Sequence, residues 1–207
     1  MLKNVLKLTL VAQSLFLSTS VLATTYNFIG VNANEVNVSN QLSLDVTQIG
    51  NSVDFNFINA SGGEQTFVGA IYFDFLGANP FSSLTQTFST GTVSFTGITP
   101  SDQNFPEGNN IDFNTDAEGD RNGSAANGIN VGESLVLTGL LSSPADINAL
   151  LQSGGLRVGL HLQGYESGGS DSYVTTPNGP SEVPLPAAAW LFGSALVGFA
   201  GFKRKSI

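Results

Sequence analysis

Residues 42–59 read LSLDVTQIGNSVDFNFIN, a stretch that indicates β structure. Apolar and polar residues alternate on both sides of Gly50-Asn51, as in two strands that each bury one face. The alternating apolar residues are Leu42, Leu44, Val46, Val53, Phe55 and Phe57. Because Gly50-Asn51 suits a two-residue turn, the stretch predicts an antiparallel β-hairpin.

The same rhythm continues outward through residues 24–176, where short alternating runs are broken by glycine, asparagine and serine. The further alternating residues are Ile71, Phe73 and Phe75, then Val93 and Phe95, then Leu135 and Leu137, then Leu156, Val158, Leu160 and Leu162. Phenylalanine-rich faces favour two sheets closed over one aromatic core. We therefore expect an all-β fold, a single antiparallel β-sandwich of jelly-roll-like type.

One short helix is predicted between the strands. Ser143 is the expected N-cap, Pro144 fits the first turn, Asp146 stands three residues after the cap, and Gly154 ends the helix. The residues expected to face the sheet are Ile147, Leu150 and Leu151.

The charge distribution is uneven. All sixteen acidic residues lie between Glu35 and Glu182, where the basic residues are Arg121 and Arg157, so this segment has a net charge of about −14. Such a surface repels phosphate backbones, which argues against nucleic acid as a partner. The chain has no cysteine, which excludes disulfides and thiolate sites, and the segment has no lysine for a P-loop or Schiff base.

Residues 1–23 have the pattern of a secretory signal peptide. A basic start with two lysines precedes a mostly apolar run over 8–17, and Val21 and Ala23 supply small residues for cleavage after Ala23. The prediction implies the Sec translocon and signal peptidase as partners. The alternative is an uncleaved anchor, for which the apolar run is short.

The other end has the pattern of a membrane anchor. Residues 177–182 form a linker, and residues 185–202 carry no charge and suffice for a single transmembrane helix of about 27 Å. The basic tail Lys203, Arg204 and Lys205 follows at once. The positive-inside rule places that tail in the cytoplasm and the preceding domain outside it.

The junction between linker and span carries a recognisable motif, Val183, Pro184, Leu185, Pro186 and Ala187. With the span and the basic tail, residues 183–207 closely resemble the VPLPA variant of the PEP-CTERM sorting domain. The resemblance implies processing by an exosortase, an integral-membrane enzyme, in bacteria that typically make exopolysaccharide. The two prolines favour extended backbone, which a protease can bind without unwinding a helix.

His161 is the only histidine, which excludes a multi-histidine zinc site and makes it the sole base available to a serine triad. On an alternating strand it shares a face with Arg157 and Gln163. We interpret it as a surface or edge histidine. No catalytic set is evident, and we expect the protein not to be an enzyme.

One cluster suggests metal binding. Oxygen-bearing residues alternate in the manner of a calcium loop at Asp112, Asn114, Asp116, Glu118 and Asp120. Ala117 stands where an EF-hand requires glycine, and the surroundings suit an ordinary solvated loop. We expect no cofactor, with calcium as the alternative.

The leading hypothesis is an exported, non-enzymatic protein. It begins as an inner-membrane-anchored precursor and becomes a cell-surface or secreted protein after processing, with a structural or interaction role in an exopolysaccharide or biofilm envelope. The first alternative is a carbohydrate- or calcium-binding module, with Tyr72, Tyr165 and Tyr173 as stacking candidates. The second is an exported glycosidase that uses paired carboxylates.

Overall fold

The structure is a computed structural model that describes residues 23–32 and 34–177, and this part of the chain is an all-β domain with one short α-helix. The strands are β1 (Thr24–Gly30), β2 (Leu42–Ile49), β3 (Ser52–Asn59), β4 (Phe67–Phe75), β5 (Phe81–Ser89), β6 (Thr99–Pro100), β7 (Ala117–Asp120), β8 (Ile129–Asn130), β9 (Glu133–Leu141), β10 (Leu156–Gln163) and β11 (Ser170–Thr175). The helix is α1 (Ile147–Ser153), and single 3₁₀ turns are η1 (Ser39–Gln41), η2 (Gly108–Asn110) and η3 (Ala125–Asn127).

None of the helices in the described ranges has the length and apolar character needed to cross a bilayer. The predicted span at residues 185–202 and all but the last residue of the predicted signal peptide lie outside the described residues.

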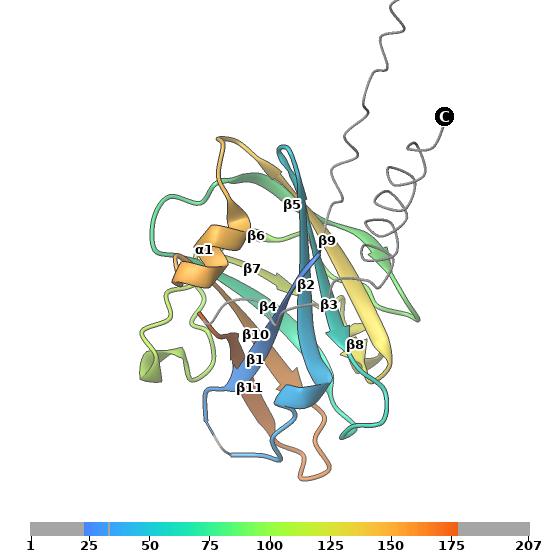
Figure 1. The fold of residues 1–207 in the computed structure, drawn as a ribbon. Helices are drawn as coiled ribbons and strands as arrows, with labels where there is room; N and C mark the ends of the chain where they lie inside the picture. Colours follow the sequence, from blue (N-terminus) through green and yellow to red (C-terminus); the bar gives the residue numbers. More distant parts are fainter. Residues whose placement is uncertain (1–22, 33, 178–207) are drawn as a thin grey trace, which may run out of the picture.

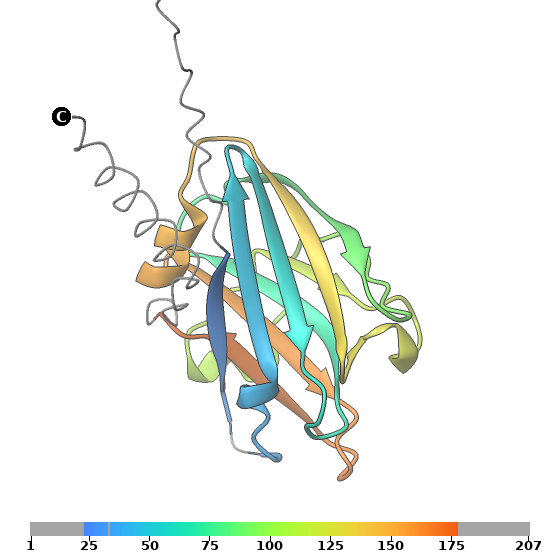
Figure 2. The ribbon, with the colours of Figure 1, turned by 45° about the vertical axis from the view of Figure 1, so that its right-hand side comes forward.

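The strands form two antiparallel layers (Figure 1). Sheet A has the order β5-β9-β3-β2-β1, and sheet B has the order β1-β11-β10-β4-β7-β6 with β8 beside β4. Figure 2 shows β1, β2, β3 and β9 side by side in one layer, with β10 and β11 behind them. The two layers give the domain a sandwich-like form.

Strand β1 belongs to both sheets. Residues 24–27 pair with β2, and residues 28–30 pair with β11. On the opposite side, Leu84 bridges Ile98 and Phe95 bridges Arg121. The antiparallel sheet therefore nearly closes on itself, and the domain is barrel-like as well as sandwich-like.

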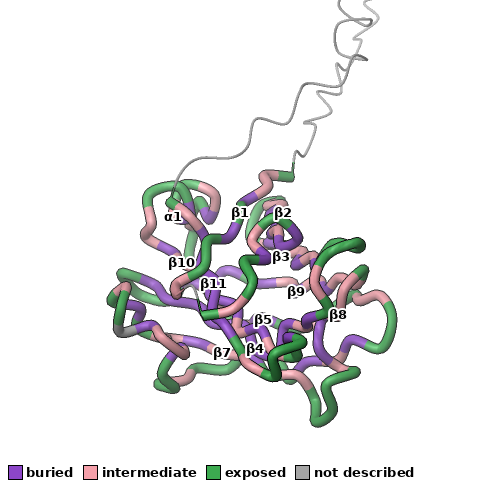
Figure 3. Tube along the Cα trace, turned by 90° about the horizontal axis from the view of Figure 1, so that it is seen from below, coloured by how far each residue is buried: buried purple, intermediate pink, exposed green. Residues whose placement is uncertain are grey.

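A single large core lies between the layers, where the view from below shows most of the buried chain (Figure 3). Phe55 from sheet A meets the Phe73 ring of sheet B edge-on at 5.6 Å, and Phe81 lies 5.7 Å from Phe55. Burial of each such ring stabilises the fold by about 1.5–3 kcal/mol, so these rings hold the two sheets together.

The predicted apolar residues of β2, β3, β4, β9 and β10 are all buried, and burial alternates along most of β2, β3 and β9 as predicted. The prediction of one buried face is wrong for β4, which is buried on both faces. The predicted hairpin is also confirmed, since Ile49 pairs with Ser52 across Gly50-Asn51 and Gly50 has a φ of +59°. The prediction for Val93 and Phe95 is wrong in part, because both are buried but lie outside the strands.

The segment that contains Val93 and Phe95 forms no strand because its backbone groups bond to other partners. Gly91 turns the chain with a φ of +61°, Ser94 N donates to Asn127 O at 2.9 Å, and Phe95 N donates to the Gln86 side chain at 2.8 Å. Loop and side-chain acceptors thus replace most of a regular strand ladder.

The predicted helix is present, but its cap is Asp146 and not Ser143. Asp146 Oδ1 accepts from Ala149 N at 3.0 Å, and Gln48 of β2 accepts from Ile147 N while donating to Ala145 O. These contacts start the helix later than the sequence pattern indicates. Gly154 ends the helix with a φ of +76°, as predicted. The residues predicted to face the sheet do so, with Ile147 and Leu151 buried and Leu150 partly buried.

Candidate functional site

The outer face of sheet B carries a second, smaller core. Residues 101–116, here called the cover loop, cross this face between β6 and β7. Phe105 packs 5.2 Å from the Tyr72 ring and 4.5 Å from the Phe113 ring. The buried members of this cluster are Ala70, Tyr72, Phe105, Phe113 and Val174. The cover loop is therefore a packed part of the domain.

Arg157 ties the cover loop to the sheet. It forms an ion pair with Asp74, with Nε donating to Oδ2 at 2.8 Å, and it donates through Nη1 to Ile111 O at 2.7 Å and through Nη2 to Asp112 O. Its guanidinium also lies over the Phe113 ring. Burial raises the pKa of Asp74, and the bond and charge of Arg157 act in the opposite direction. One arginine thus satisfies a buried carboxylate and two loop carbonyls.

Several of the predicted calcium residues have hydrogen-bond partners of their own within the protein. Asp112, with a φ of +50°, gives its carbonyl to Arg157, and Asp116 Oδ2 accepts from Phe75 N at 2.6 Å. Glu118 and Asp120 lie further on, in β7, and Glu118 accepts from Ser101 Oγ at 2.7 Å. Across residues 23–32 and 34–177, no three His, Cys, Asp or Glu side chains are placed to hold a metal ion.

Glu118 is nevertheless an unusual carboxyl group. Burial raises its pKa, the bond from Ser101 lowers it, and the neighbouring Asp120 raises it again. Because Glu118 and Asp120 alternate on one strand, they point to the same side of β7. The calcium site stays a prediction, with part of its ligand set already bonded within the protein.

His161 lies within sheet B and not at its edge, since β10 is flanked by β11 and β4. Its ring nitrogens are 3.4 Å from Ser172 Oγ and from Gln163 Nε2, and Ser172 is fully buried. Burial lowers the pKa of His161, while the charge of Glu107 raises it. The predicted surface position is thus corrected to a half-buried one on the outer face of a central strand.

The three tyrosines considered for sugar stacking are buried, so their rings are not free to stack on a ligand. Tyr72 belongs to the small core, and the Tyr165 hydroxyl donates to the Tyr173 hydroxyl at 3.3 Å. The Tyr173 hydroxyl also accepts from Val38 N at 3.0 Å. Burial raises the pKa of Tyr72 and of Tyr165.

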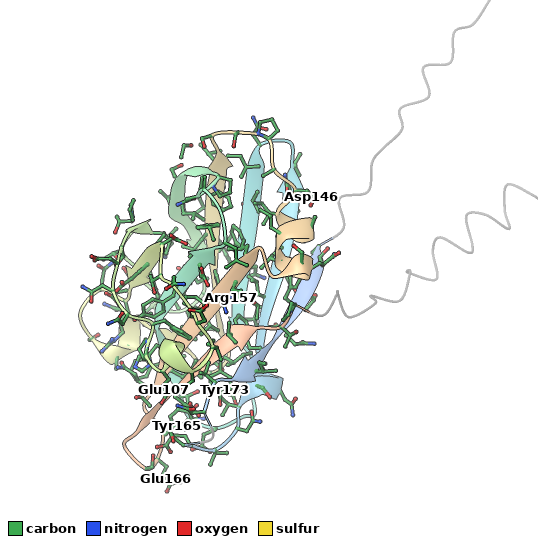
Figure 4. All side chains as sticks on the ribbon, turned by 90° about the vertical axis from the view of Figure 1, so that its left-hand side faces the viewer. Glu107, Asp146, Arg157, Tyr165, Glu166 and Tyr173 are labelled. Carbon is green, nitrogen blue, oxygen red and sulfur yellow. The ribbon has the colours of Figure 1, made fainter. Side chains whose placement is uncertain are left out.

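Acidic side chains from distant segments meet at one end of the domain, a cluster that the sequence did not reveal. A cavity of about 360 Å³ there is lined by residues that include Asn32, Glu35, Asn37, Asp171 and Tyr173. Glu107 lies beside them, and its Oε1 accepts from Asn34 Nδ2 at 2.8 Å. Figure 4 shows Glu107, Tyr165 and Tyr173 together at this end, with Asp146 at the other.

The predicted sorting motif, Val183, Pro184, Leu185, Pro186 and Ala187, lies outside the described residues, as do Val21 and the basic tail Lys203, Arg204 and Lys205. Ala23 is the first described residue and is exposed, directly before β1.

Comparison of the sequence with models of known protein families finds no match, and a search of curated proteins finds no similar one. The residues and the fold of this chain by themselves define an acidic all-β domain.

Proposed function

We propose that this chain is an exported, non-enzymatic protein of the bacterial cell envelope, sorted by an exosortase-like enzyme through residues 183–207. One observation carries most weight beside the sequence motif. β1 begins at Thr24, directly after the predicted signal cleavage, and β11 ends at Thr175, just before the predicted linker at residues 177–182. Cleavage at both predicted places would release a domain that keeps all its strands.

The two ends of this domain also lie together. Thr176 N donates to Asn27 O at 3.3 Å, so the chain leaves the domain beside the strand on which it enters. A domain of this kind can be held at a membrane by a short linker without disturbing either sheet. In the proposal, residues 185–202 anchor the precursor in the inner membrane until processing transfers the domain to the cell surface or the medium.

The rest of the proposal concerns the domain itself. We take it as a jelly-roll-like sandwich with a structural or interaction role, and with exopolysaccharide as its partner in the matrix. The charge favours this role, because the described residues include two arginines and no lysine, and Arg157 is already paired with Asp74. A surface of this charge stays soluble and favours neutral polymers or cations over anionic ones.

The test is the intact mass of the protein from outer-membrane and extracellular fractions of cells that possess an exosortase. We expect a chain that begins at Thr24 and ends near Val183. As a variant, Pro184→Ala with Pro186→Ala should retain the tail and stay in the inner membrane. The matched control is Pro177→Ala with Pro180→Ala in the linker, which should be processed normally. Surface copies that all keep residues 185–207 would refute the exosortase part.

A further inference from the structure

The loops at one end of the domain carry no charged residue. Three segments form this end, here called the uncharged end, and they are residues 49–52, 76–80 and 140–145. The first and third are joined by a bond from Leu141 N to Asn51 O at 2.9 Å. The second and third are joined by a bond from Ser142 N to Pro80 O at 2.8 Å. Figure 1 shows the turn between β2 and β3 at the top, beside the loop that leads to α1.

Large apolar side chains project from the uncharged end into solvent. In the described part of the chain six such side chains are exposed, and three of them, Ile49, Leu76 and Leu140, belong to this end. They are 62%, 69% and 50% exposed, respectively. Ile49 and Leu140 both pair with Ser52, one on each side of it, so their side chains lie on the same face of sheet A. Exposed apolar side chains that gather in one place are typical of a surface that contacts a protein or a membrane.

The opposite end of the domain, here called the acidic end, has the reverse character. Each of three loops there carries a glutamate, and the residues are Glu35, Glu64 and Glu166. Glu107 and Asp171 lie at the same end, around the cavity described above. Figure 4 shows Glu107 and Glu166 at this end, and Asp146, which borders the uncharged end, at the other. The domain is therefore polarised along its strands, with apolar side chains at one end and carboxylates at the other.

The chain leaves the domain close to the uncharged end. A Cβ on Gly154, which ends α1, would lie only 3.5 Å from Pro177 Cβ, and the next residue, Gly155, accepts from Leu76 N at 3.0 Å. Residues 178–184 separate Pro177 from the predicted membrane span, and these seven residues reach at most about 25 Å when fully extended. A tether this short holds the uncharged end, and not the acidic end, nearest to the bilayer.

We propose that the uncharged end rests on the outer surface of the inner membrane while the precursor is anchored, with Ile49, Leu76 and Leu140 among the lipid headgroups and the acidic end turned away. This inference rests on the proposed function, because the tether and the span belong to that proposal. Contact with lipid removes the three apolar side chains from water, and the three segments contain no charge that would lose its hydration. Anionic lipids repel the acidic end, so both ends of the domain favour the same orientation.

The experiment uses single cysteines, which report without background because the chain has none of its own. Precursors with Ile49→Cys, Leu76→Cys or Leu140→Cys are purified from membranes of cells without an exosortase and labelled with a fluorophore. They are then reconstituted in vesicles of phosphatidylethanolamine and phosphatidylglycerol that contain a nitroxide-labelled lipid as quencher. Val36→Cys, at an equally exposed apolar residue beside Glu35, is the matched control. We expect quenching at the three positions of the uncharged end and little or none at the control.

Flotation of the same vesicles separates this inference from the proposed function. A chain that floats with the vesicles but is quenched equally at all four positions, or at none, refutes the orientation and leaves the anchor in place. Labels at the uncharged end that are shielded from water without lipid quenching would assign the surface to a protein partner, and this result also refutes the contact with lipid. A chain that does not float refutes the anchor, and the orientation with it.

A double variant tests the apolar contact itself. Ile49→Glu with Leu140→Glu places two carboxylates at the uncharged end, so the label at Leu76→Cys should lose its quenching while the chain stays on the vesicles. Ile29→Glu with Val36→Glu adds the same charge at two other exposed apolar residues and should leave that quenching intact. Quenching retained in the first variant, or lost equally in both, would overturn the proposal.

Discussion

Arg157 and Asp74 form an ion pair between β10 and β4, directly opposite each other in the strand register and beneath the cover loop. Asp74 is 1% exposed, so its charge depends almost entirely on Arg157. Because the same guanidinium binds Ile111 O and Asp112 O, the pair connects the ladder of sheet B with the loop that covers it.

Removal of Arg157 should therefore be severe. We expect Arg157→Ala to lower the free energy of unfolding by about 3–5 kcal/mol, because Asp74 is left buried and unpaired. The double variant with Asp74→Ala should lose less than Arg157→Ala alone. Urea denaturation of Arg157→Ala, Asp74→Ala and the double variant measures these losses. A double variant that is less stable than either single variant would contradict the interpretation.

Gly159 makes room for the cover loop. A Cβ at this position would lie 2.8 Å from Phe105 Cε2, inside contact distance with a ring that is itself buried. Gly159→Ala should displace Phe105 and cost about 1–3 kcal/mol. Gly77→Ala, where nothing lies within 4 Å, is the matched control and should change stability little. Thermal unfolding compares the two, and equal effects would exclude the steric explanation.

The helix cap offers a test at single-residue level. Asp146→Ala should cost about 1 kcal/mol, because it removes the acceptor of Ala149 N. Asp146→Asn should keep most of the stability, since an amide oxygen also caps well. Ser143→Ala should have no effect on the helix. A larger loss of stability for Ser143→Ala than for Asp146→Ala would instead identify Ser143 as the N-cap, as the sequence predicts.

Stability should depend on pH through Asp171. Its pKa is raised in the folded state, mainly by burial, so its contribution is complete below the unfolded value near 3.9 and is lost as pH rises through the folded value. Asp171→Asn should remove this loss, because its amide carries no charge at any pH, and the variant should be more stable than the parent protein above neutral pH. Unfolding measured from pH 4 to 8 decides it. A variant that loses stability throughout would contradict the sign.

Calcium can be tested directly on the predicted residues. We expect the same Tm in EDTA and in millimolar calcium, because the Asp112 carbonyl and the Asp116 carboxylate are bonded within the protein. A clear rise in Tm with calcium that Asp120→Asn abolishes would instead establish a calcium loop at residues 112–120.

Sequence alternation predicted the strands whose inward residues follow a strict period of two, as in Val53, Phe55 and Phe57. It missed β5, because the register shifts between Phe81 and Ser83 and again between Gln86 and Phe88. Each bulge changes which face the following side chains point to, so apolar residues no longer alternate. It also missed β11, where buried polar residues interrupt the apolar pattern.

The sequence pattern could not predict the acidic cluster, for a different reason. Glu35, Glu107 and Asp171 come from three segments that only the sheet topology brings to one end of the domain. No spacing along the chain relates them. The predicted cluster at residues 112–120 had the opposite character, since its regular spacing is local but the fold turns its members to different partners.

The position of β1 sets the order in which the domain can be completed. Its first half pairs with β2, which follows soon after it, and its second half pairs with β11, the last strand. If the chain passes through a translocon with its amino end first, as proposed, the pairing of β1 with β11 cannot form until Thr175 has emerged. The two sheets are then joined through β1 only at the end of transport, which agrees with a pathway that carries unfolded chains. A chain that stalls before β11 would expose half of β1 as an unpaired edge, a natural target for periplasmic chaperones and proteases.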